Sequence, residues 1–435
     1  MSLNNNFTVS RVPNTHRLPF FSLALIHMGM LTALDQFMLG AVLGHSMTIK
    51  EAFLAITGGS VIFFIATFGL GYAGMKEGLS GSMLSRWCGF GRTGSALVGL
   101  LIAVSLMGWF GVQNAVFARS LDFSTGRVLG FKGAAALSGI SLTILVAFGI
   151  GALKYTAKIA VPLFLVNVVY ITWVIFNGNM PQDAASQIES PLSVSTGMTL
   201  VVGGAIVASL ITPDITRYSR STSSVFWMVL LTVFLGEYVV NGFAIYLAMR
   251  LNTADVVTIM SQASAGIGFL VVVFSTLRIN DVNLYSSSLG VANFIEILTG
   301  RKFSYLFLTL LIGFTSTLLS VFGILDKFVN FLTLLGIFFP PVIGVMLTDY
   351  FLLKTHRKAL DHSRVRGSIP TKIPRFGFCA IVASLLGGVA GYVITDGVPA
   401  VTSLIVGCLS YIILKFVMDY AASFSRYKFR AGNHN

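Results

Sequence analysis

Arg278, Asn280 and Asp281 stand in the stretch FSTLRINDVNLYSSS (residues 274–288), between the apolar runs GIGFLVVV and LGVANFIEIL. Both runs are apolar enough to lie in a membrane. A charged side chain at that depth is costly unless it is paired, and such residues usually mark a binding site or an ion path. An arginine stays protonated and needs acidic groups or carbonyl oxygens as partners. The stretch therefore predicts a functional site inside a membrane-spanning helix.

The composition of the whole chain agrees with a membrane location. Of 435 residues, 55% are hydrophobic and 10% are charged, and the mean hydropathy is +0.84. Soluble proteins carry about 25% charged residues, and long apolar runs without alternation favour helices over a barrel. We expect an all-α integral membrane protein with twelve transmembrane helices, near residues 18–43, 49–75, 93–118, 130–152, 156–177, 196–213, 222–249, 266–291, 304–324, 328–352, 374–395 and 398–418.

Basic residues gather on one side of these spans. With the N-terminus inside, most Lys and Arg fall in inside segments, above all 354–375, and the 119–132 loop is the main exception. This positive-inside pattern indicates that the net charge of +13 reports topology and not a nucleic-acid partner. Contact of residues 354–375 with anionic lipid heads is the alternative. We expect a multi-pass protein of the cytoplasmic membrane with both termini in the cytoplasm. No cleavable signal peptide is expected, because the first apolar run is too long.

The spans leave no room for a separate soluble domain. The expected parts are an N-terminal tail (1–17), a core (18–352), a basic cytoplasmic loop (353–373), helices 11 and 12 (374–418) and a C-terminal tail (419–435).

Glycines interrupt the first helix of each of two five-helix blocks, 18–177 and 196–352. Gly29 lies in the first block, and the pair Gly203-Gly204 lies in the second. Interrupted helices at corresponding positions predict an inverted-repeat transporter with a binding site at the membrane midplane. Close helix packing is the alternative explanation of these glycines.

Several motifs give the chain a family resemblance over nearly its whole length. They are GYAGMKEGLSGSMLSRWCGFG (71–91), MGWFGV (107–112), TPDITRYSR (212–220), NDVNLYSSSLGVAN (280–293) and FPPVIGVMLTDYFL (339–352). In this order they resemble the nucleobase:cation symporter family NCS1, closest to its cytosine permease branch. The resemblance implies a LeuT-type 5+5 inverted-repeat core plus two C-terminal helices. It also implies a central site between helices 1, 3, 6, 8 and 10, and uptake of a small heterocyclic base, in most relatives with sodium.

The resemblance assigns two residues to the substrate. Trp109 matches a stacking tryptophan, and an indole face suits a flat heteroaromatic ring; an interface anchor or core filler is the alternative. Asn280 matches a residue that contacts the base, and its carboxamide offers both a donor and an acceptor. An interhelical hydrogen bond is the alternative for Asn280.

Three neighbouring positions of this site depart from the cytosine permease pattern. Ala205 and Val207, beside Gly203 and Gly204, stand where that branch carries phenylalanine and serine, and Leu106 stands where it carries glutamine. A site that loses polar partners rejects the substrate that needs them. Cytosine itself is therefore disfavoured, and a bulkier or less polar ring is expected.

The ion site departs more sharply. In sodium-coupled relatives, helix 1 carbonyls, here those of Gly29 and Thr32, and two helix 8 hydroxyls hold the ion. The hydroxyl positions correspond to Arg278 and Ile279. A hard cation needs oxygen ligands, whereas a guanidinium can occupy a cation site itself. We expect Arg278 to replace sodium, which makes sodium-independent transport the favoured hypothesis.

Three acids are candidate partners of Arg278. Asp35 lies one turn beyond Thr32, Glu237 lies in the middle of span 7, and Asp281 lies three residues from Arg278. Burial favours the neutral form of a carboxyl group, so Asp35 or Glu237 is predicted to carry a proton. A permanent ion pair that only links helices is the alternative. His27, next to Gly29, is a further proton-carrier candidate, although a packed, satisfied histidine is the more common case.

Other function classes find little support. The sequence contains no metal-ligand spacing, nucleophile elbow or phosphate loop, and Cys88, Cys379 and Cys408 have no paired spacing. An enzyme, a metal site and a cofactor are therefore not expected. A channel would require a filter or a ring of charge. A sodium-coupled cytosine symporter and a base sensor without transport remain as alternatives, and the sequence does not specify the base.

Overall fold

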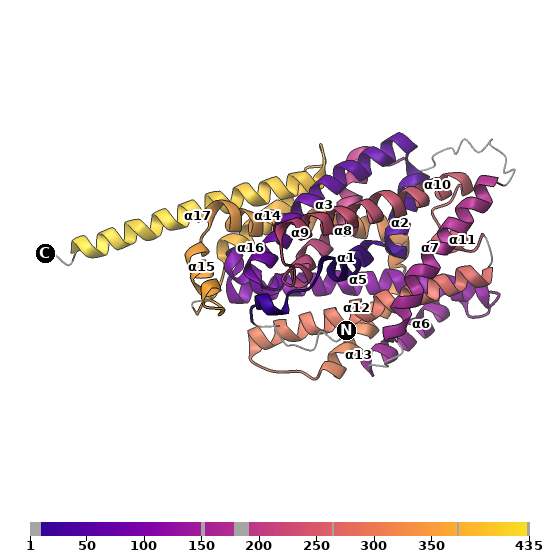
Figure 1. Ribbon diagram of the computed structural model, residues 1–435, viewed down its shortest axis with the longest axis horizontal. Helices are drawn as coiled ribbons and strands as arrows, with labels where there is room; N and C mark the ends of the chain where they lie inside the picture. The colour runs from indigo at the N-terminus through magenta and orange to yellow at the C-terminus, as the bar shows by residue number, and fades with distance from the viewer. Residues whose placement is uncertain (1–9, 149–152, 178–190, 263–264, 372–373, 433–435) are drawn as a thin grey trace.

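The computed structural model describes residues 10–148, 153–177, 191–262, 265–371 and 374–432, and the regular structure in these ranges is helical (Figure 1). Two short segments are 3-10 helices, η1 (Asn14–His16) and η4 (Ile324–Lys327), and three are π-helices, η2 (Arg86–Phe90), η3 (Phe234–Val240) and η5 (Thr348–Leu353). The α-helices are α1 (Phe20–Leu31), α2 (Leu34–Ser46), α3 (Ile49–Glu77), α4 (Gly81–Ser85), α5 (Gly91–Ser124), α6 (Gly130–Ala147), α7 (Leu153–Asn177), α8 (Val194–Thr216), α9 (Thr222–Val233), α10 (Asn241–Leu251), α11 (Val256–Met260), α12 (Ala265–Thr299), α13 (Tyr305–Val321), α14 (Phe328–Leu347), α15 (Arg357–Val365), α16 (Phe378–Val393) and α17 (Pro399–Gly432).

The predicted membrane-spanning character is confirmed. Among the described residues, nine helices are long and apolar enough to cross a membrane, and the bent pair α1 and α2 makes a tenth. Each of the twelve predicted stretches overlaps one helix or one chain of consecutive helices. Two of them, α13 and α16, are shorter than the others. The twelve-span count and the two five-helix repeats therefore stay predictions.

The first predicted span is interrupted, as expected. α1 ends at Leu31, α2 begins at Leu34, and the two axes are bent by 46°. Thr32 leaves the helical conformation, and its hydroxyl donates to the Met28 carbonyl at 2.9 Å. The break exposes the last carbonyls of α1 and the first amides of α2, which are the groups a helix leaves without internal partners.

The predicted interruption at Gly203-Gly204 is wrong. α8 runs unbroken from Val194 to Thr216. A Cβ atom added to Gly203 would collide with the carbonyl oxygen of Leu332 in α14, and one added to Gly336 of α14 would collide with the Thr199 carbonyl of α8. The two glycines let the backbones of α8 and α14 approach each other, which is the packing role of small residues between membrane helices.

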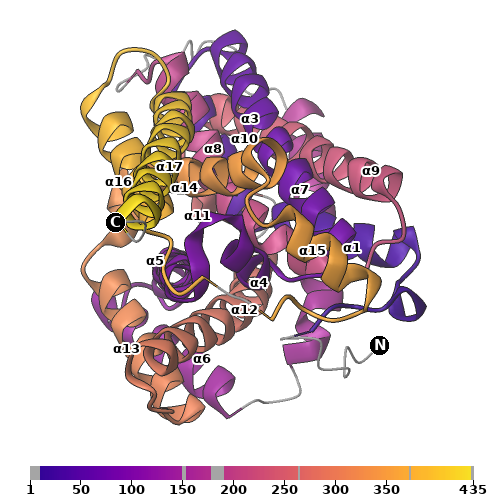
Figure 2. The same cartoon turned by 90° about the vertical axis from the view of Figure 1, so that its left-hand side faces the viewer.

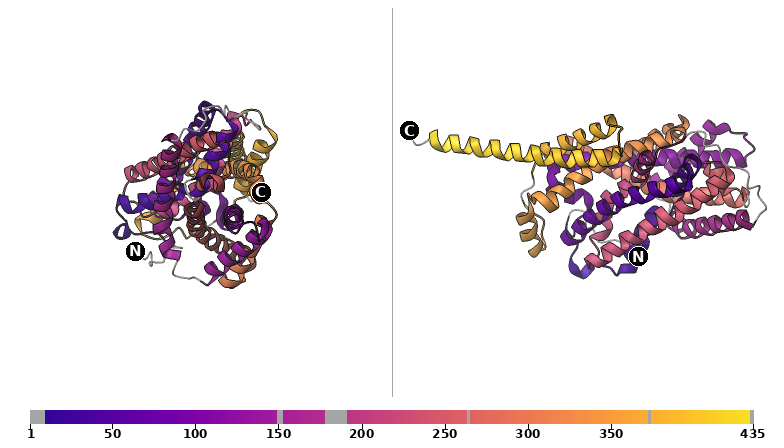
Figure 3. Two further views of the ribbon diagram at one scale, coloured as in Figure 1. Left: turned by 90° about the vertical axis from the view of Figure 1, so that its right-hand side faces the viewer. Right: turned by 90° about the horizontal axis from the view of Figure 1, so that it is seen from above.

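Two pairs of long helices run through the bundle. α3 packs along α8, and α5 packs along α12. Figure 2 shows α16 and α17 side by side on one flank, with α6 and α13 together on another. α17 continues as a single helix well beyond the rest of the bundle (Figure 3). The segments that meet in the centre are therefore distant in sequence.

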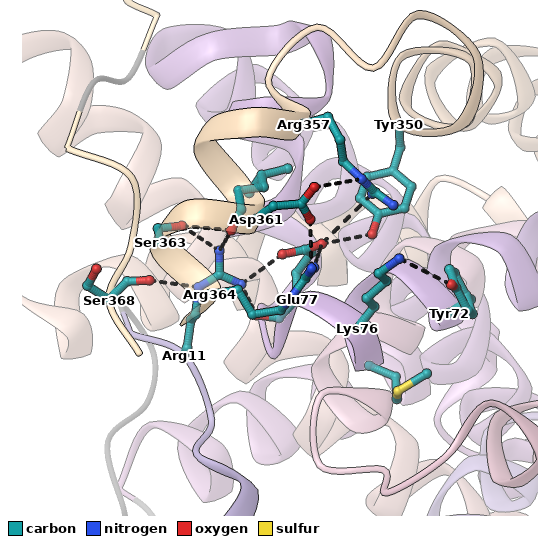
Figure 4. A network of polar contacts seen from close by, with 12 residues as sticks. Arg11, Tyr72, Lys76, Glu77, Tyr350, Arg357, Asp361, Ser363, Arg364 and Ser368 are labelled. Carbon is teal, nitrogen blue, oxygen red and sulfur yellow. Dashed lines mark hydrogen bonds and ion pairs between the residues drawn. The ribbon is translucent and has the colours of Figure 1, made fainter. Parts of the chain in front are cut away.

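Glu77 connects the first described residues of the chain to α15, which follows η5. α3 ends at Glu77 because Gly78 adopts a left-handed conformation (φ 62°), and the Gly78 carbonyl accepts a hydrogen bond from the Val12 amide at 2.9 Å. The buried Glu77 carboxylate accepts from Arg11 (2.9 Å), Arg364 of α15 (2.8 Å) and the Tyr350 hydroxyl of η5 (2.9 Å) (Figure 4).

Arg11 also reaches α15. Its guanidinium donates to the Leu360 carbonyl at 3.2 Å and to the Ser363 hydroxyl at 2.9 Å (Figure 4). Burial lowers the pKa of Arg11, and the adjacent Glu77 opposes this shift. We call Arg11, Glu77, Tyr350 and Arg364 the Glu77 cluster. It joins four segments at the end of the molecule where α1 begins and α3 ends.

Candidate functional site

A cavity of about 330 Å³ lies between five helices, α1, α2, α5, α8 and α12. It brings together eight of the thirteen predicted site residues, although they are spread over some 250 positions of the chain. The lining residues are Ile26, Gly29, Met30, Leu31, Asp35, Leu106, Trp109, Gly204, Ala205, Val207, Ala208, Ile211, Ile215, Arg278, Ile279, Val282 and Asn283. Five predicted residues are not among them: Thr32, Gly203, Glu237, Asn280 and Asp281.

Trp109 contributes an aromatic wall to the cavity. Its side chain is 7% exposed, and its ring meets the edges of Phe331 (5.3 Å between centroids) and Phe328 (6.1 Å), both from α14. A Cβ atom on Gly108 would lie 2.5 Å from the Phe331 ring. Gly108 therefore allows α14 to support the indole from the side away from the cavity.

Arg278 reaches across the cavity to the broken helix. Its Nη2 donates to the carbonyl oxygen of Gly29 at 2.9 Å. Gly29 belongs to the last turn of α1, where backbone carbonyls lack partners and carry partial negative charge. A Cβ atom on Gly29 would lie 3.0 Å from Nη2. The absence of a side chain at Gly29 thus permits the close approach of the guanidinium.

Asp35 is the acid whose charge acts on Arg278. It lies in the first turn of α2, beside the backbone amides of that turn. No ion pair within 4.0 Å joins it to Arg278 in the described part of the chain. Its Oδ1 is buried and has no hydrogen-bond partner. Two opposite charges therefore face one cavity without touching.

Glu237 lies in a different environment. Its carboxylate is fully buried in η3 and accepts a hydrogen bond from Asn241 at 2.9 Å, with Gln36 of α2 beside it. Its Oε1 has no partner. Asp281 lies near Tyr305 of α13. Neither acid lines the cavity, so the geometry favours Asp35 as the partner of Arg278.

Asn280 and Asn283 stand one turn apart on α12. Asn283 lines the cavity and donates to the Asn280 Oδ1 at 3.3 Å, whereas Asn280 is fully buried behind it with an unpartnered Nδ2. Sequence reasoning missed Asn283 and named Asn280. The available signal was its position about one helical turn beyond Arg278 and Ile279.

The remaining wall of the cavity is apolar. Leu106, Ala205 and Val207 line it as expected, and each is almost completely buried. Ile26, Ile211 and Ile215, which the sequence did not single out, extend the same wall toward the start of α1 and the end of α8. A ligand here meets few polar groups, so those few decide its orientation.

His27 packs outside the cavity. Its Nδ1 lies 2.6 Å from the Thr232 hydroxyl of α9, and its Nε2 lies 2.9 Å from the Thr212 hydroxyl of α8. Both ring nitrogens have a partner, and the side chain is fully buried. This arrangement agrees with the packed, satisfied histidine.

The opposite end of the molecule is bridged by Arg119 at the end of α5. It pairs with Asp326 of η4 at 2.6 Å and with Asp255, which caps α11, at 3.5 Å. All four apolar residues of α11 are buried (Val256, Val257, Ile259 and Met260). A wider, polar cavity of about 620 Å³ lies outside this bridge. Arg119, Asp255 and Asp326 are not among the residues that line the central cavity.

Comparison with known proteins gives matches over almost the whole chain. The sequence model of a family described as permease for cytosine/purines, uracil, thiamine, allantoin matches residues 12–414. The cytosine permease of Escherichia coli (strain K12) is 32% identical over 422 residues, which cover 96% of both chains. The hydantoin permease of Microbacterium maritypicum is 24% identical over 376 residues, or 80% of this chain and 76% of the relative.

Solved structures show the same fold. The inward-facing conformation of Mhp1 superimposes with a TM-score of 0.75 at 20% identity, over 97% of this chain and 95% of Mhp1. Mhp1 in a closed conformation with bromovinylhydantoin bound gives 0.68 at 20% identity, over 96% and 97%. A sodium-coupled sialic acid symporter gives 0.55 at 14% identity, over 94% and 91%. With the extended family match and the shared motifs, these comparisons show that the chain belongs to the cytosine/purine permease family, also called the nucleobase:cation symporter family NCS1.

Proposed function

We propose that this chain imports a small, neutral heterocyclic base across the cytoplasmic membrane by alternating access, without sodium. Members of the family are permeases and not enzymes. The relatives are named for cytosine and hydantoin, and a cavity of about 330 Å³ with one tryptophan wall suits a flat ring of that size.

The hydrogen bond from Arg278 to Gly29 carries the sodium-independent part of the proposal. In the sodium-coupled pattern that the sequence resembles, the Gly29 carbonyl would serve the ion. Here a guanidinium nitrogen lies 2.9 Å from that oxygen, and the neighbouring Ile279 offers no oxygen ligand. A fixed positive charge at this position would repel sodium.

Asp35 is the candidate proton carrier in this scheme. It lines the cavity opposite Arg278, and one of its carboxylate oxygens has no partner. Glu237 is the second candidate, because it is fully buried and only partly hydrogen-bonded. Either carboxyl group would bind a proton and release it when the cavity changes its exposure, because solvation and neighbouring charges shift the balance between its two forms.

Uptake into proteoliposomes tests the sodium-independent proposal. Labelled cytosine, uracil and hydantoin are supplied with sodium, potassium or choline outside. We expect saturable uptake of at least one base at a rate that does not depend on the cation. Uptake that collapses without sodium would show a sodium symporter, and binding without accumulation would show a sensor.

The proton-carrier hypothesis has a separate readout. With an inward pH gradient, the unmodified chain is expected to accumulate the base above equilibrium. Asp35→Asn should remove this accumulation while counterflow exchange continues, and Glu237→Gln should leave it in place. The reverse pattern would identify Glu237, and an unmodified chain that ignores the gradient would exclude proton coupling.

The cavity wall guides the choice of base. Leu106, Ala205 and Val207 offer no hydrogen bonds, and loss of a needed partner discriminates strongly. We therefore propose that cytosine is a weaker substrate than rings with larger apolar substituents.

A further inference from the structure

Few polar side chains line the cavity. Of its seventeen lining residues, only Asp35, Arg278 and Asn283 carry polar side chains, besides the indole nitrogen of Trp109. Asn283 already donates to Asn280. Orientation of a bound ring therefore depends mainly on Asp35 and Arg278, which the sodium-replacement argument treats as coupling groups and not as substrate contacts.

Arg278 carries more hydrogen-bond donors than its contact with Gly29 uses. A guanidinium carries five N–H groups, and the contact with Gly29 uses one nitrogen, Nη2. In the ranges that the structure describes, Nε and Nη1 have no hydrogen-bond acceptor, and neither is among the buried unpartnered atoms. The side chain is only partly buried and lines the cavity. Its free N–H groups are thus open to a ligand.

Asp35 supplies the complementary function. Its carboxyl group lies in the first turn of α2, beside the amides at the start of that helix. An ionised carboxylate has about four acceptor positions, so it keeps capacity for another donor. It lines the same cavity as Arg278, and the described residues show no ion pair between them, so a ligand in the cavity would meet a donor from one side chain and an acceptor from the other.

We propose that Arg278 and Asp35 together determine substrate specificity by hydrogen bonding to a lactam group in the substrate ring. This proposal rests on the proposed transport function. Arg278 donates to the ring carbonyl oxygen, and Asp35 accepts from the adjacent ring N–H. The two charges of the site cancel, so a neutral ligand leaves no charge unpaired in the membrane. The substrate class is therefore a neutral cyclic lactam or imide, stacked on Trp109 in an otherwise apolar pocket.

Binding of matched probes to the purified full-length chain tests this assignment. Uracil and hydantoin present N–H beside C=O, 1,3-dimethyluracil and 1,3-dimethylhydantoin lack the N–H, and pyrimidine lacks the carbonyl. Isothermal titration in detergent gives Kd for each. We expect the lactams to bind at least about tenfold tighter than their analogues, because each lost charge-assisted hydrogen bond is worth a factor of about 10 to 100.

Variants connect the preference to the two residues. Arg278→Gln should weaken uracil and hydantoin by about tenfold or more and leave pyrimidine unchanged. Asp35→Asn should reduce the preference for the parent rings over their dimethyl forms. This comparison distinguishes the effect of the lost N–H from the effect of the added methyl groups, because only the first depends on Asp35. Exposed Arg301→Gln and Glu296→Gln are the matched controls and should change no ratio. If Arg278→Gln does not fold, Arg278→Lys and Asp35→Asn carry the same comparison.

The assignment would be wrong if the Arg278 and Asp35 variants left the ratios of Kd between the probes unchanged. An equal loss of affinity for every probe would contradict it in the same way. Either result leaves sodium-independent uptake standing, because that is measured by cation exchange in proteoliposomes. If none of the rings binds to the unmodified chain, both the role assigned to Arg278 and Asp35 and the proposed transport function are wrong.

Discussion

At the residue scale, Gly29 determines what the cation position can hold. Its lack of a side chain lets Nη2 of Arg278 come within 2.9 Å of the α1 carbonyl. A larger residue at this position would place its Cβ atom 3.0 Å from Nη2, so the guanidinium would have to shift by a few tenths of an ångström. Glycine and arginine thus form one unit, although 249 positions separate them in the chain.

Replacing Gly29 with alanine should break this unit. The methyl group would press on Nη2 and strain its hydrogen bond to the carbonyl, and complete loss of a charged hydrogen bond costs about 1.5–3 kcal/mol. We expect uptake (kcat/KM) to fall by about tenfold or more. Gly99→Ala on α5 is the control, because a Cβ atom there meets nothing within 4 Å. Equal activity of the two variants would contradict the role of the contact.

Trp109 provides the second prediction at this scale. Trp109→Ala removes the aromatic wall of the cavity and should raise the substrate Kd by about tenfold, since an aromatic pair adds about 0.5–1.5 kcal/mol beyond burial. Trp173→Ala is a suitable control, because that indole is 61% exposed on α7 and does not line the cavity. Titration of the bound base measures both. A Kd that stays the same for Trp109→Ala would exclude stacking.

At the element scale, glycines have different roles in the first span and in α8. The first span breaks after Leu31 and offers backbone groups to Arg278, whereas α8 stays continuous and uses Gly203 to pack against α14. The neighbouring Gly204 instead lines the cavity. Adjacent glycines thus serve different sides of one helix, since successive residues of a helix point about 100° apart.

The contrast between these glycines is testable. In Gly203→Ala the new methyl group would collide with backbone atoms of Leu332, so α8 and α14 must separate. Overpacking of this kind costs about 1–3 kcal/mol, and the thermal midpoint in detergent should fall. In Gly204→Ala the methyl group would meet only the flexible end of Leu39, at 3.0 Å. A smaller loss of stability, with altered substrate affinity, is expected there. The same loss of stability in both variants would contradict this division.

At the scale of the whole molecule, polar clusters hold the two ends of the bundle. Arg119 bridges α5, η4 and the start of α11 at one end, with partly exposed partners. The Glu77 cluster joins the start of the chain, α3, η5 and α15 at the other end, and the side chains of Glu77 and Arg11 are 0% and 5% exposed. Buried pairs lose more than exposed ones when one partner is removed.

Glu77→Gln should therefore destabilise the folded chain strongly. The change leaves Arg11 buried without its counter-charge, and breaking a buried pair costs about 3–5 kcal/mol. Thermal unfolding in detergent is the measurement. Glu296→Gln is the matched control, because the Glu296–Lys302 pair is exposed and such pairs contribute about 0–1 kcal/mol. A Glu77→Gln midpoint equal to that of the control would show that the cluster does not hold these segments.

Much of the architecture could be predicted from the sequence. Apolar runs of about 20 residues located the membrane-spanning helices, because a bilayer leaves no other partner for backbone groups. Glycine and polar residues in the first span predicted its break. A family motif drew attention to Trp109, a charge at membrane depth drew attention to Arg278, and eight predicted residues do line one cavity.

Only the tertiary structure decided how the polar groups pair. Asp35, Glu237 and Asp281 were equivalent partners of Arg278 in the sequence, and only Asp35 shares the cavity with it in the structure. Gly203 resembled a break until α14 was found against it. A sequence reports that a charge is buried, because composition and span length require it; which group faces that charge depends on the rotation and register of helices far apart in the chain.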